Sequence, residues 1–247
     1  MSILDRIAKI KDEAPRITLY GKPGIGKSTL AAQFPSPLFI LTEKNGVTGV
    51  DSTPIVTEFR TLWDDLTELS QIESIPYKTI IIDSVTKLDV LITNHILKDE
   101  KKGATLATAG GGYGAGMMRS ESIHRAFKGL LDGFQSKGIT IIYICHLTTV
   151  KFKSPDTDDY DTYNIEMACN RARSVYLDDV DFVGFCKLNS FVSEDSKSKR
   201  SKVVSGSRVI ITNSSDTHIS KNRFGIPGEI PMTYSDIAKY IPFLKGE

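Results

Sequence analysis

A short glycine-rich segment near the start of the chain has the residue types and spacing needed to hold phosphate groups. Residues 21–28 read GKPGIGKS and match the pattern G-x-x-x-x-G-K-[S/T] in full. The glycines let the backbone turn its N–H groups inward, so the loop and the helix after it form a nest for nucleotide phosphates. Lys27 would reach the β- and γ-phosphates of ATP, and the Ser28 hydroxyl would bind Mg²⁺. The predicted nucleotide-binding residues of this loop are Gly21, Pro23, Gly24, Ile25, Gly26, Lys27, Ser28 and Thr29.

Such a loop needs a second acidic group to hold the metal ion, and the segment TIIID at residues 79–83 supplies one. Asp83 would lie at the carboxyl edge of a parallel sheet and face the same crevice as the loop, so we expect it to bind Mg²⁺ together with Ser28. The alternative is that Asp83 caps a helix that begins near Val85. Ser84 follows Asp83, whereas AAA+ type enzymes usually carry a catalytic Glu there. The base that activates water must therefore come from elsewhere.

Two more polar residues follow predicted strands. Glu43 lies just beyond the apolar run 38–41 and could orient water for in-line attack on the γ-phosphate. A solvated loop glutamate would look the same in sequence. His146 follows the run 139–145 and could hydrogen-bond the γ-phosphate and relay its presence to the next loop. The alternative for His146 is a histidine that only ends a strand.

The rest of the chain predicts the elements that position these residues. Apolar, β-branched runs alternate with segments of helical period, which is typical of a parallel sheet covered by helices. Apolar stripes at helical spacing run through residues 59–69, 85–96 and 123–134. The fold class is therefore α/β, with a P-loop core whose mostly parallel sheet is flanked by helices and ends in a C-terminal antiparallel hairpin. The predicted strands are Ile17–Tyr20, Leu38–Leu41, Lys78–Ile82, Ile139–Cys145, Val180–Leu188 and Val203–Thr212.

The organisation predicts one domain over residues 1–247, with an N-terminal helix at 1–13 and a basic hairpin at 187–212. Segments 103–116 and 148–170 resist regular assignment. Unstructured segments of that length inside a compact domain are usually functional or disordered. We find no internal repeat and no change of composition that would mark a second domain.

Composition narrows the class of protein. The 247 residues include 31 Lys and Arg against 30 Asp and Glu, with 40% hydrophobic residues. This balance excludes a strongly basic DNA-coating protein, so any contact with nucleic acid must come from a local patch. No apolar stretch approaches the ~18 residues of a membrane span, and the first residues lack a signal-peptide pattern. Three widely spaced cysteines argue against a disulfide framework or a zinc site. A cytoplasmic protein fits best.

These motifs together resemble the RecA superfamily of P-loop ATPases more than the AAA+ enzymes. The similarity rests on the P-loop, Glu43 after the next strand, the pair Asp83-Ser84, and His146 after the strand that follows. Residues 221–225 read KNRFG and resemble a motif of the RadA branch. With YGAG at residues 113–116, the chain also resembles phage-encoded ATP-binding proteins of the RecA type, a group that includes single-strand annealing recombinases. Such a protein would act in the host bacterial cytoplasm.

The resemblance implies a RecA-like core that binds and hydrolyses Mg-ATP. In that family picture Lys27, Ser28 and Asp83 hold Mg-ATP, Glu43 is the base and His146 senses the γ-phosphate. Lys221 and Arg223 would act as fingers on the nucleotide of a neighbouring subunit, which implies a homo-oligomer, either a ring or a filament. The alternative for KNRFG is a basic turn that ends at a glycine.

Single-stranded DNA is the partner that the sequence favours. Between residues 187 and 208, six basic residues face only two acidic ones, so a hairpin there could bind phosphates with little sequence preference. A merely solvated charged surface is the alternative. The loop around Tyr113 could offer an aromatic platform for bases, and Arg171 and Arg173 are further candidate contacts.

Three functions follow from these observations. The first is an ATPase, stimulated by DNA or by assembly, that acts on single-stranded DNA in phage-type annealing or recombination. The second is an ATP-dependent loader or switch that acts on a helicase, a single-strand-binding protein or another replication protein. The third is a small-molecule P-loop kinase, which we rank last because segments 103–116 and 148–170 lack the arginines of a closing lid.

Overall fold

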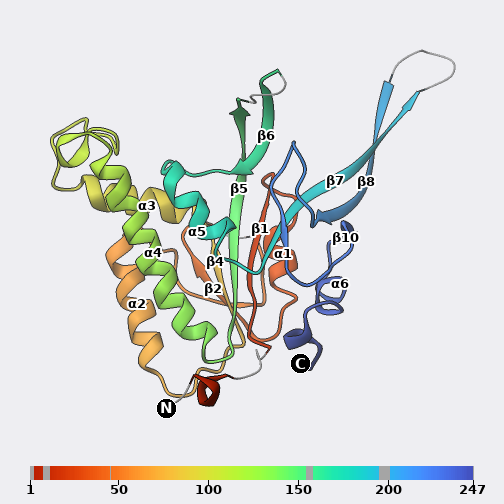
Figure 1. Ribbon diagram of the computed structural model, residues 1–247, viewed down its shortest axis with the longest axis horizontal. Coiled ribbons are helices and arrows are strands. Elements are labelled where there is room, and N and C mark those ends of the chain that lie inside the picture. The colour runs from red at the N-terminus through yellow and green to blue at the C-terminus, as the bar shows by residue number, and fades with distance from the viewer. Residues whose placement is uncertain (1–2, 8–11, 45, 154–157, 195–200, 247) are drawn as a thin grey trace.

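A twisted β-sheet with helices on both faces forms the centre of the molecule (Figure 1). The computed structural model describes residues 3–7, 12–44, 46–153, 158–194 and 201–246. The strands are β1 (Arg16–Gly21), β2 (Pro37–Leu41), β3 (Asp51–Ser52), β4 (Thr79–Asp83), β5 (Thr140–Phe152), β6 (Tyr160–Ile165), β7 (Phe182–Glu194), β8 (Ser201–Ile211), β9 (Lys221–Asn222) and β10 (Glu229–Pro231). The α-helices are α1 (Lys27–Ala31), α2 (Phe59–Gln71), α3 (Val85–Leu97), α4 (Ala115–Gln135), α5 (Arg173–Leu177) and α6 (Tyr234–Ala238).

The strand order is β10-β8-β7-β1-β5-β4-β2-β3. The pairs from β7 through β1, β5, β4 and β2 to β3 are parallel, and β8 joins β7 in an antiparallel hairpin. The expected α/β fold class, a mostly parallel sheet flanked by helices with a C-terminal antiparallel hairpin, is confirmed. β5 lies between β1 and β4, so the carboxyl ends of these three strands meet at one edge of the sheet.

Alternating apolar residues explain why the sheet is covered on both faces. In β4, Ile80 and Ile82 pack into one core cluster and Ile81 into the other. The first cluster takes its other side chains from α2, α3 and α4, whose apolar stripes are buried as predicted. The second lies under α1 and α6. No helix in the described part of the chain is long and apolar enough to cross a bilayer.

Segment 148–170 is more regular than the sequence suggested. β5 continues to Phe152 and pairs with β6 in a second antiparallel hairpin, from Leu147 opposite Ile165 to Phe152 opposite Tyr160. The expectation of a long irregular loop was wrong here, because the backbone groups of this segment are satisfied by strand pairing. Short 3-10 turns also occur in the chain, at Leu4–Arg6, Ala109–Gly111, Asn170–Ala172 and Pro242–Gly246.

Three other expectations have mixed outcomes. Of the helix expected over 1–13, the structure describes only a 3-10 turn and the non-helical residues 12–13, and residues 1–2 and 8–11 lie outside the described part. Segment 103–116 holds a 3-10 turn and the start of α4, with positive φ at five glycines and at Tyr113. The basic hairpin is β7–β8, but Lys197, Lys199 and Arg200 at its tip lie outside the described residues.

Candidate active site

The phosphate-binding loop connects the end of β1 to α1. Gly21 ends the strand, and a Cβ there would lie 2.3 Å from the carbonyl oxygen of Cys186 on β7, so the position accepts only glycine. Gly24 and Gly26 have φ values of 75° and 104°, a region that favours glycine. The Lys27 Nζ donates to the carbonyl oxygens of Gly21 (2.9 Å) and Lys22 (3.2 Å). Its ammonium is therefore already held against the loop.

Burial shapes the chemistry of Lys27. The side chain is 6% exposed, and this burial lowers the pKa of the amine, while the nearby Cys186, Cys145 and Asp83 act in the opposite direction. The carboxylates of Asp83 and Glu43 favour the charged form of this ammonium. A phosphate bound in the loop would do the same.

Ser28 and Asp83 lie side by side, as a shared metal ion requires. Ser28 Oγ donates to Asp83 Oδ2 over 2.7 Å, although 55 residues separate them in sequence. Asp83 is 5% exposed, and burial, together with the charge of Glu43, raises its pKa against the effect of the Ser28 hydrogen bond. The Ser28 hydroxyl and the Asp83 carboxylate supply oxygen ligands of the kind that Mg²⁺ prefers, and a bound cation would favour the charged form of the buried carboxylate. The helix-cap alternative for Asp83 is not what the structure has, because Ser84 is the N-cap of α3 and accepts from Lys87 N.

Glu43 and His146 converge on the same edge of the sheet. His146 Nε2 lies 2.9 Å from Glu43 Oε1, and Ser84 Oγ donates to that same oxygen. The two side chains are 23% and 21% exposed, so Glu43 is not a freely solvated loop residue. Thr42 ties the segment after β2 to Ser84, because its hydroxyl accepts from Ser84 N and donates to Ser84 O, both at 2.8 Å.

These groups surround one cavity of about 420 Å³, a volume within the usual range of small-molecule sites. The structure therefore brings together residues from three neighbouring strand ends and the phosphate-binding loop. The predicted site residues that line it are Pro23, Gly24, Gly26, Lys27, Ser28, Thr29, Glu43, Asp83 and His146. Gly21 and Ile25 shape the loop but do not line this cavity.

Arg208 also lines this cavity, although its sequence context predicts only a basic residue of the hairpin. It lies on β8, and one guanidinium nitrogen, Nη1, would be 2.9 Å from a Cβ placed on Gly26. The exposed guanidinium has no hydrogen bond or ion pair to any described residue. The face of β8 on which Arg208 lies could have been predicted from Ile210, two residues further along the strand. Residues two apart in a strand point to the same face, and Ile210 is buried on the face that carries α1.

Lys221 and Arg223 do not join this cavity. Lys221 lies in β9, opposite Val183 at the amino end of β7, whereas the P-loop follows the carboxyl end of β1. The Lys221 ammonium donates to the carbonyl oxygen of Asp178, and Arg223 Nη1 lies 2.7 Å from Asp181 Oδ1. Any action on ATP would therefore concern the nucleotide of another subunit, and that role stays a prediction.

A family model described as an AAA domain matches residues 13–224. Among solved structures, the crystal structure of the flagellar accessory protein FlaH from Methanocaldococcus jannaschii aligns with 89% of this chain and 90% of that one, at 12% identity and a TM-score of 0.37. This likeness is too distant to carry information on function. No curated protein matches the sequence.

Proposed function

Because the chain belongs to the AAA domain family, we propose that it hydrolyses Mg-ATP at the cavity described above and that it acts on single-stranded DNA in phage-type annealing or recombination. The observation that carries the ATPase proposal is the convergence of Lys27, the Ser28–Asp83 pair and the Glu43–His146 pair in one cavity. Lys27 and Ser28 come from the start of α1, Asp83 from the end of β4, Glu43 from the segment after β2 and His146 from β5, and all of them line the space beside the P-loop.

Each residue of the cavity has its own proposed role in ATP hydrolysis. The Lys27 ammonium would leave the carbonyl oxygens of the loop and bind phosphate oxygens, while Ser28 and Asp83 would hold Mg²⁺. Bound Mg²⁺ would neutralise part of the phosphate charge. Glu43 would accept the proton of the attacking water, and His146, in contact with Glu43, would respond to the γ-phosphate. His146 is in turn joined to α3 by its backbone N–H, which donates to Thr86 Oγ1 over 2.9 Å.

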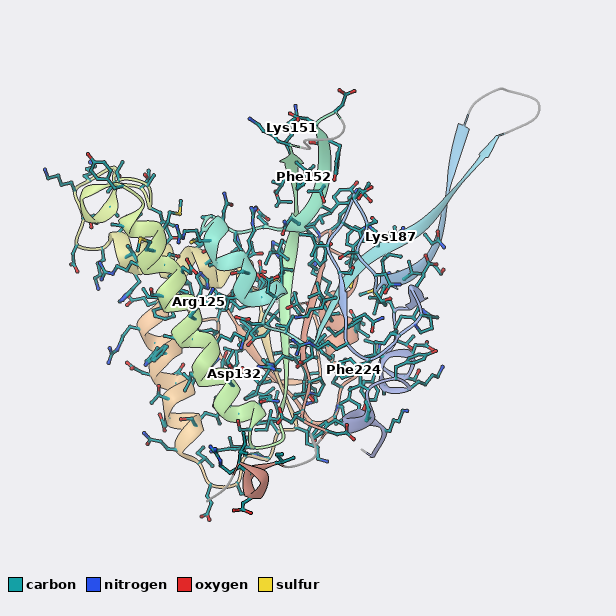
Figure 2. The ribbon with its side chains drawn as sticks, viewed as in Figure 1. Arg125, Asp132, Lys151, Phe152, Lys187 and Phe224 are labelled. Carbon is teal, nitrogen blue, oxygen red and sulfur yellow. The ribbon has the colours of Figure 1, made fainter. Side chains whose placement is uncertain are left out.

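Support for DNA as the partner comes from the two hairpins that extend beyond the sheet at the edge that carries the P-loop (Figure 1). Figure 2 shows Lys151 at the outer part of β5 and Lys187 nearer the body of the protein on β7. Lys187 and Arg208 are the described basic side chains of the β7–β8 hairpin. Such an arrangement can bind a phosphate backbone without reading base sequence.

A loader or switch that acts on a replication protein is the second candidate. Phe152, at the end of β5, is 46% exposed and packs on Tyr160 of β6 with 5.3 Å between ring centroids. An aromatic pair with one exposed ring on a projecting hairpin suits a protein partner as well as a base.

The test is the rate of ATP turnover with and without a dT20 oligonucleotide, in the presence and absence of Mg²⁺. Wild type should need Mg²⁺ and should accelerate with DNA. Lys27→Ala should lose ATP binding or turnover, and Glu43→Gln should keep ATP binding and lose most hydrolysis. Glu68→Gln, on the exposed face of α2, is the matched control and should match wild type.

Three results would contradict different parts of this proposal. Turnover by Lys27→Ala at the wild-type rate would refute the ATP site. Unchanged turnover by Glu43→Gln would make Glu43 an ordinary loop residue. A wild-type rate that does not respond to DNA, together with no measurable DNA binding, would favour the loader.

A further inference from the structure

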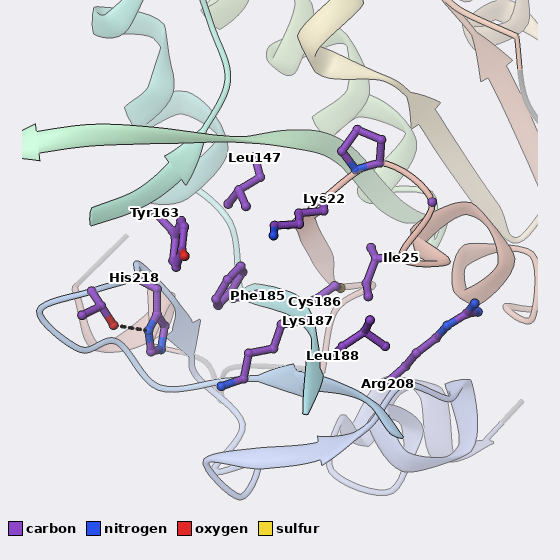
Figure 3. Close-up of a pocket in the computed structure, with 13 residues that line it drawn as sticks. Lys22, Ile25, Leu147, Tyr163, Phe185, Cys186, Lys187, Leu188, Arg208 and His218 are labelled. Atoms are coloured by element: carbon purple, nitrogen blue, oxygen red, sulfur yellow. Dashed lines mark hydrogen bonds between the residues drawn. The ribbon is translucent and has the colours of Figure 1, made fainter. Parts of the chain in front are cut away.

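A second cavity, of about 490 Å³, lies against the outer side of the P-loop (Figure 3). Its floor is formed by residues 22–25 of the loop, and its walls come from β5, β6, β7 and the segment 217–218. None of Lys27, Ser28, Glu43, Asp83 or His146 lines it. The cavity is therefore distinct from the ATP site, although Pro23, Gly24 and Arg208 border both.

One wall of this cavity consists of aromatic rings. Phe185 lies between Tyr163, with 5.4 Å between ring centroids, and His218, at 5.3 Å, and the planes are tilted by 34° and 31°. Tyr163 is 39% exposed, so part of its ring is free to receive another flat group. The Tyr163 N–H donates to Thr217 O over 2.8 Å, which fixes the segment before His218 against β6. Phe185 is 5% exposed and also stacks on Tyr20, so the ring set is packed from behind and its exposed part, chiefly Tyr163, suits stacking of a nucleobase.

The charged groups of the cavity all have one sign. Lys22, Lys187 and Arg208 line it, and no carboxylate does. Neither Lys22 nor Lys187 has a side-chain hydrogen bond or ion pair to any residue in the described part of the chain. Figure 3 shows Lys22 directed toward Tyr163 and Phe185. Unpaired cations beside aromatic rings match a ligand that carries both a phosphate and a base.

We propose that this cavity binds one nucleotide of a single-stranded DNA, with its base on the Tyr163–Phe185–His218 wall and its phosphates on Lys22 and Lys187. The proposal rests on the proposed DNA partner and adds its place on the protein. The adenine of the hydrolysed ATP is not the expected occupant. Thr29, the expected contact of the α-phosphate and so of the base side of ATP, lines the first cavity and not this one.

The position of Lys22 couples the two cavities. Its side chain faces the second cavity, while its carbonyl oxygen accepts a hydrogen bond from Lys27 Nζ, the group that would bind ATP phosphates. A DNA phosphate held by Lys22 would fix the part of the loop on which Lys27 rests. DNA binding would thereby alter the readiness of Lys27 for ATP, which gives a direct route for DNA-dependent turnover.

The experiment measures dT20 binding by fluorescence anisotropy without nucleotide, over a range of salt concentrations. Tyr163→Ala should weaken binding roughly tenfold through lost stacking, and Tyr163→Phe, which keeps the ring, should bind like wild type. Lys187→Gln should weaken binding and lower the salt slope by about one unit. Lys98→Ala, an exposed lysine at the end of α3, is the control and should leave both quantities unchanged.

The outcomes separate this proposal from the wider function. If wild type binds dT20 and both Tyr163→Ala and Lys187→Gln bind equally well, the cavity assignment is overturned while the DNA partner stands. If wild type hydrolyses ATP but binds no dT20, the DNA partner is overturned and the cavity assignment with it. If Tyr163→Ala weakens ATP binding and leaves dT20 binding intact, the cavity belongs to ATP and the proposal is wrong. Lys187→Gln, on a half-buried side chain, keeps the test informative should Tyr163→Ala not fold.

Discussion

At the scale of single residues, Arg208 is the side chain whose role the fold changes most. Its guanidinium covers Gly26 at the start of α1, borders both cavities and has no carboxylate partner in the described residues. An unpaired guanidinium beside a phosphate-binding loop is suited to bidentate contact with the phosphate oxygens of an ATP bound to the same subunit.

We predict that Arg208→Gln weakens ATP binding by roughly 10- to 100-fold, the usual effect of losing a hydrogen bond to a charged group. Arg208→Lys should recover part of this affinity, because it restores the charge without the planar fork. Titration with a fluorescent ATP analogue measures the change, with Arg119→Gln on the exposed surface of α4 as control. Equal affinities for wild type and Arg208→Gln would show that the guanidinium only covers the loop.

The positions of Asp83, Glu43 and His146 in the site could be predicted from the sequence, whereas that of Arg208 could not. Asp83 ends β4, Glu43 follows β2, and His146 lies in β5 opposite the last residue of β1. Because the carboxyl ends of parallel strands meet, the convergence of these residues could be foreseen without coordinates. Arg208 reaches the site across an antiparallel pair. Its position depends on the register of β8 on β7, including an irregularity between Leu188 and Ser190, which no local pattern specifies.

At the scale of elements, Asp181 joins the start of β7 to two other segments. Its carboxylate accepts from the backbone and side chain of Arg16 on β1, at 2.9 and 3.2 Å, and pairs with Arg223 just after β9. Burial acts to raise the pKa of Asp181, but the hydrogen bonds and charge of Arg16 and the charge of Arg223 outweigh it and lower the pKa. Arg223 thus has a structural partner within its own subunit.

We predict that this carboxylate makes stability depend on acid. Because the folded pKa of Asp181 is depressed, its contribution is fully present above the unfolded pKa of about 4 and is lost as the pH falls through the lower folded value. Asp181→Asn should cost about 2 kcal/mol at neutral pH and should show a smaller further loss between pH 5 and pH 3 than wild type. Urea unfolding at a series of pH values measures both. Parallel curves for the two proteins would contradict the assignment.

The β5–β6 hairpin shows where element prediction failed. The sequence PDTDD before β6 has the acidic and turn-forming residues of a loop. The charges at Asp158, Asp159 and Asp161 hid the alternation in YDTYNI. The segment nevertheless forms a strand, because it pairs with the extended end of β5. The hairpin projects from the molecule, so both of its faces can carry polar side chains and no apolar alternation is required. The buried helices and the core strands were easier to predict, since burial imposes a regular apolar period.

At the scale of the whole molecule, the sheet separates two sets of basic residues. The P-loop and the points where both hairpins leave the sheet lie at the carboxyl end of β1, with Lys22, Lys187 and Arg208. Lys221 and Arg223 lie at the other edge, because β9 pairs with the amino end of β7. Lys221 and Arg223 therefore cannot reach the ATP cavity of their own subunit in this fold. In a ring or filament that stacks one edge on the next, the same separation would present them to the neighbour's ATP.

We predict that a Lys221→Ala, Arg223→Ala double variant binds ATP normally and hydrolyses it poorly, since its own P-loop, Ser28 and Asp83 are intact. A finger acting in trans can be worth roughly 10³- to 10⁵-fold in rate. Loss of the Arg223–Asp181 pair is a structural cost, so the thermal midpoint of the variant is measured alongside. Arg16→Ala, which removes the other side-chain partner of Asp181, provides the matched control for that cost.

Mixing decides between a trans role and a structural one. Lys27→Ala subunits have a damaged P-loop but intact fingers, so an interface between the two variants can join an intact P-loop to intact fingers. Turnover should then partly return, with a maximum at intermediate ratios. If Lys221 and Arg223 only hold Asp178 and Asp181, no mixed interface contains a complete site and the rate stays at the baseline for every ratio. Energy transfer between differently labelled subunits in the same mixtures establishes that they exchange, so a flat profile in exchanging mixtures would refute the trans role of Lys221 and Arg223.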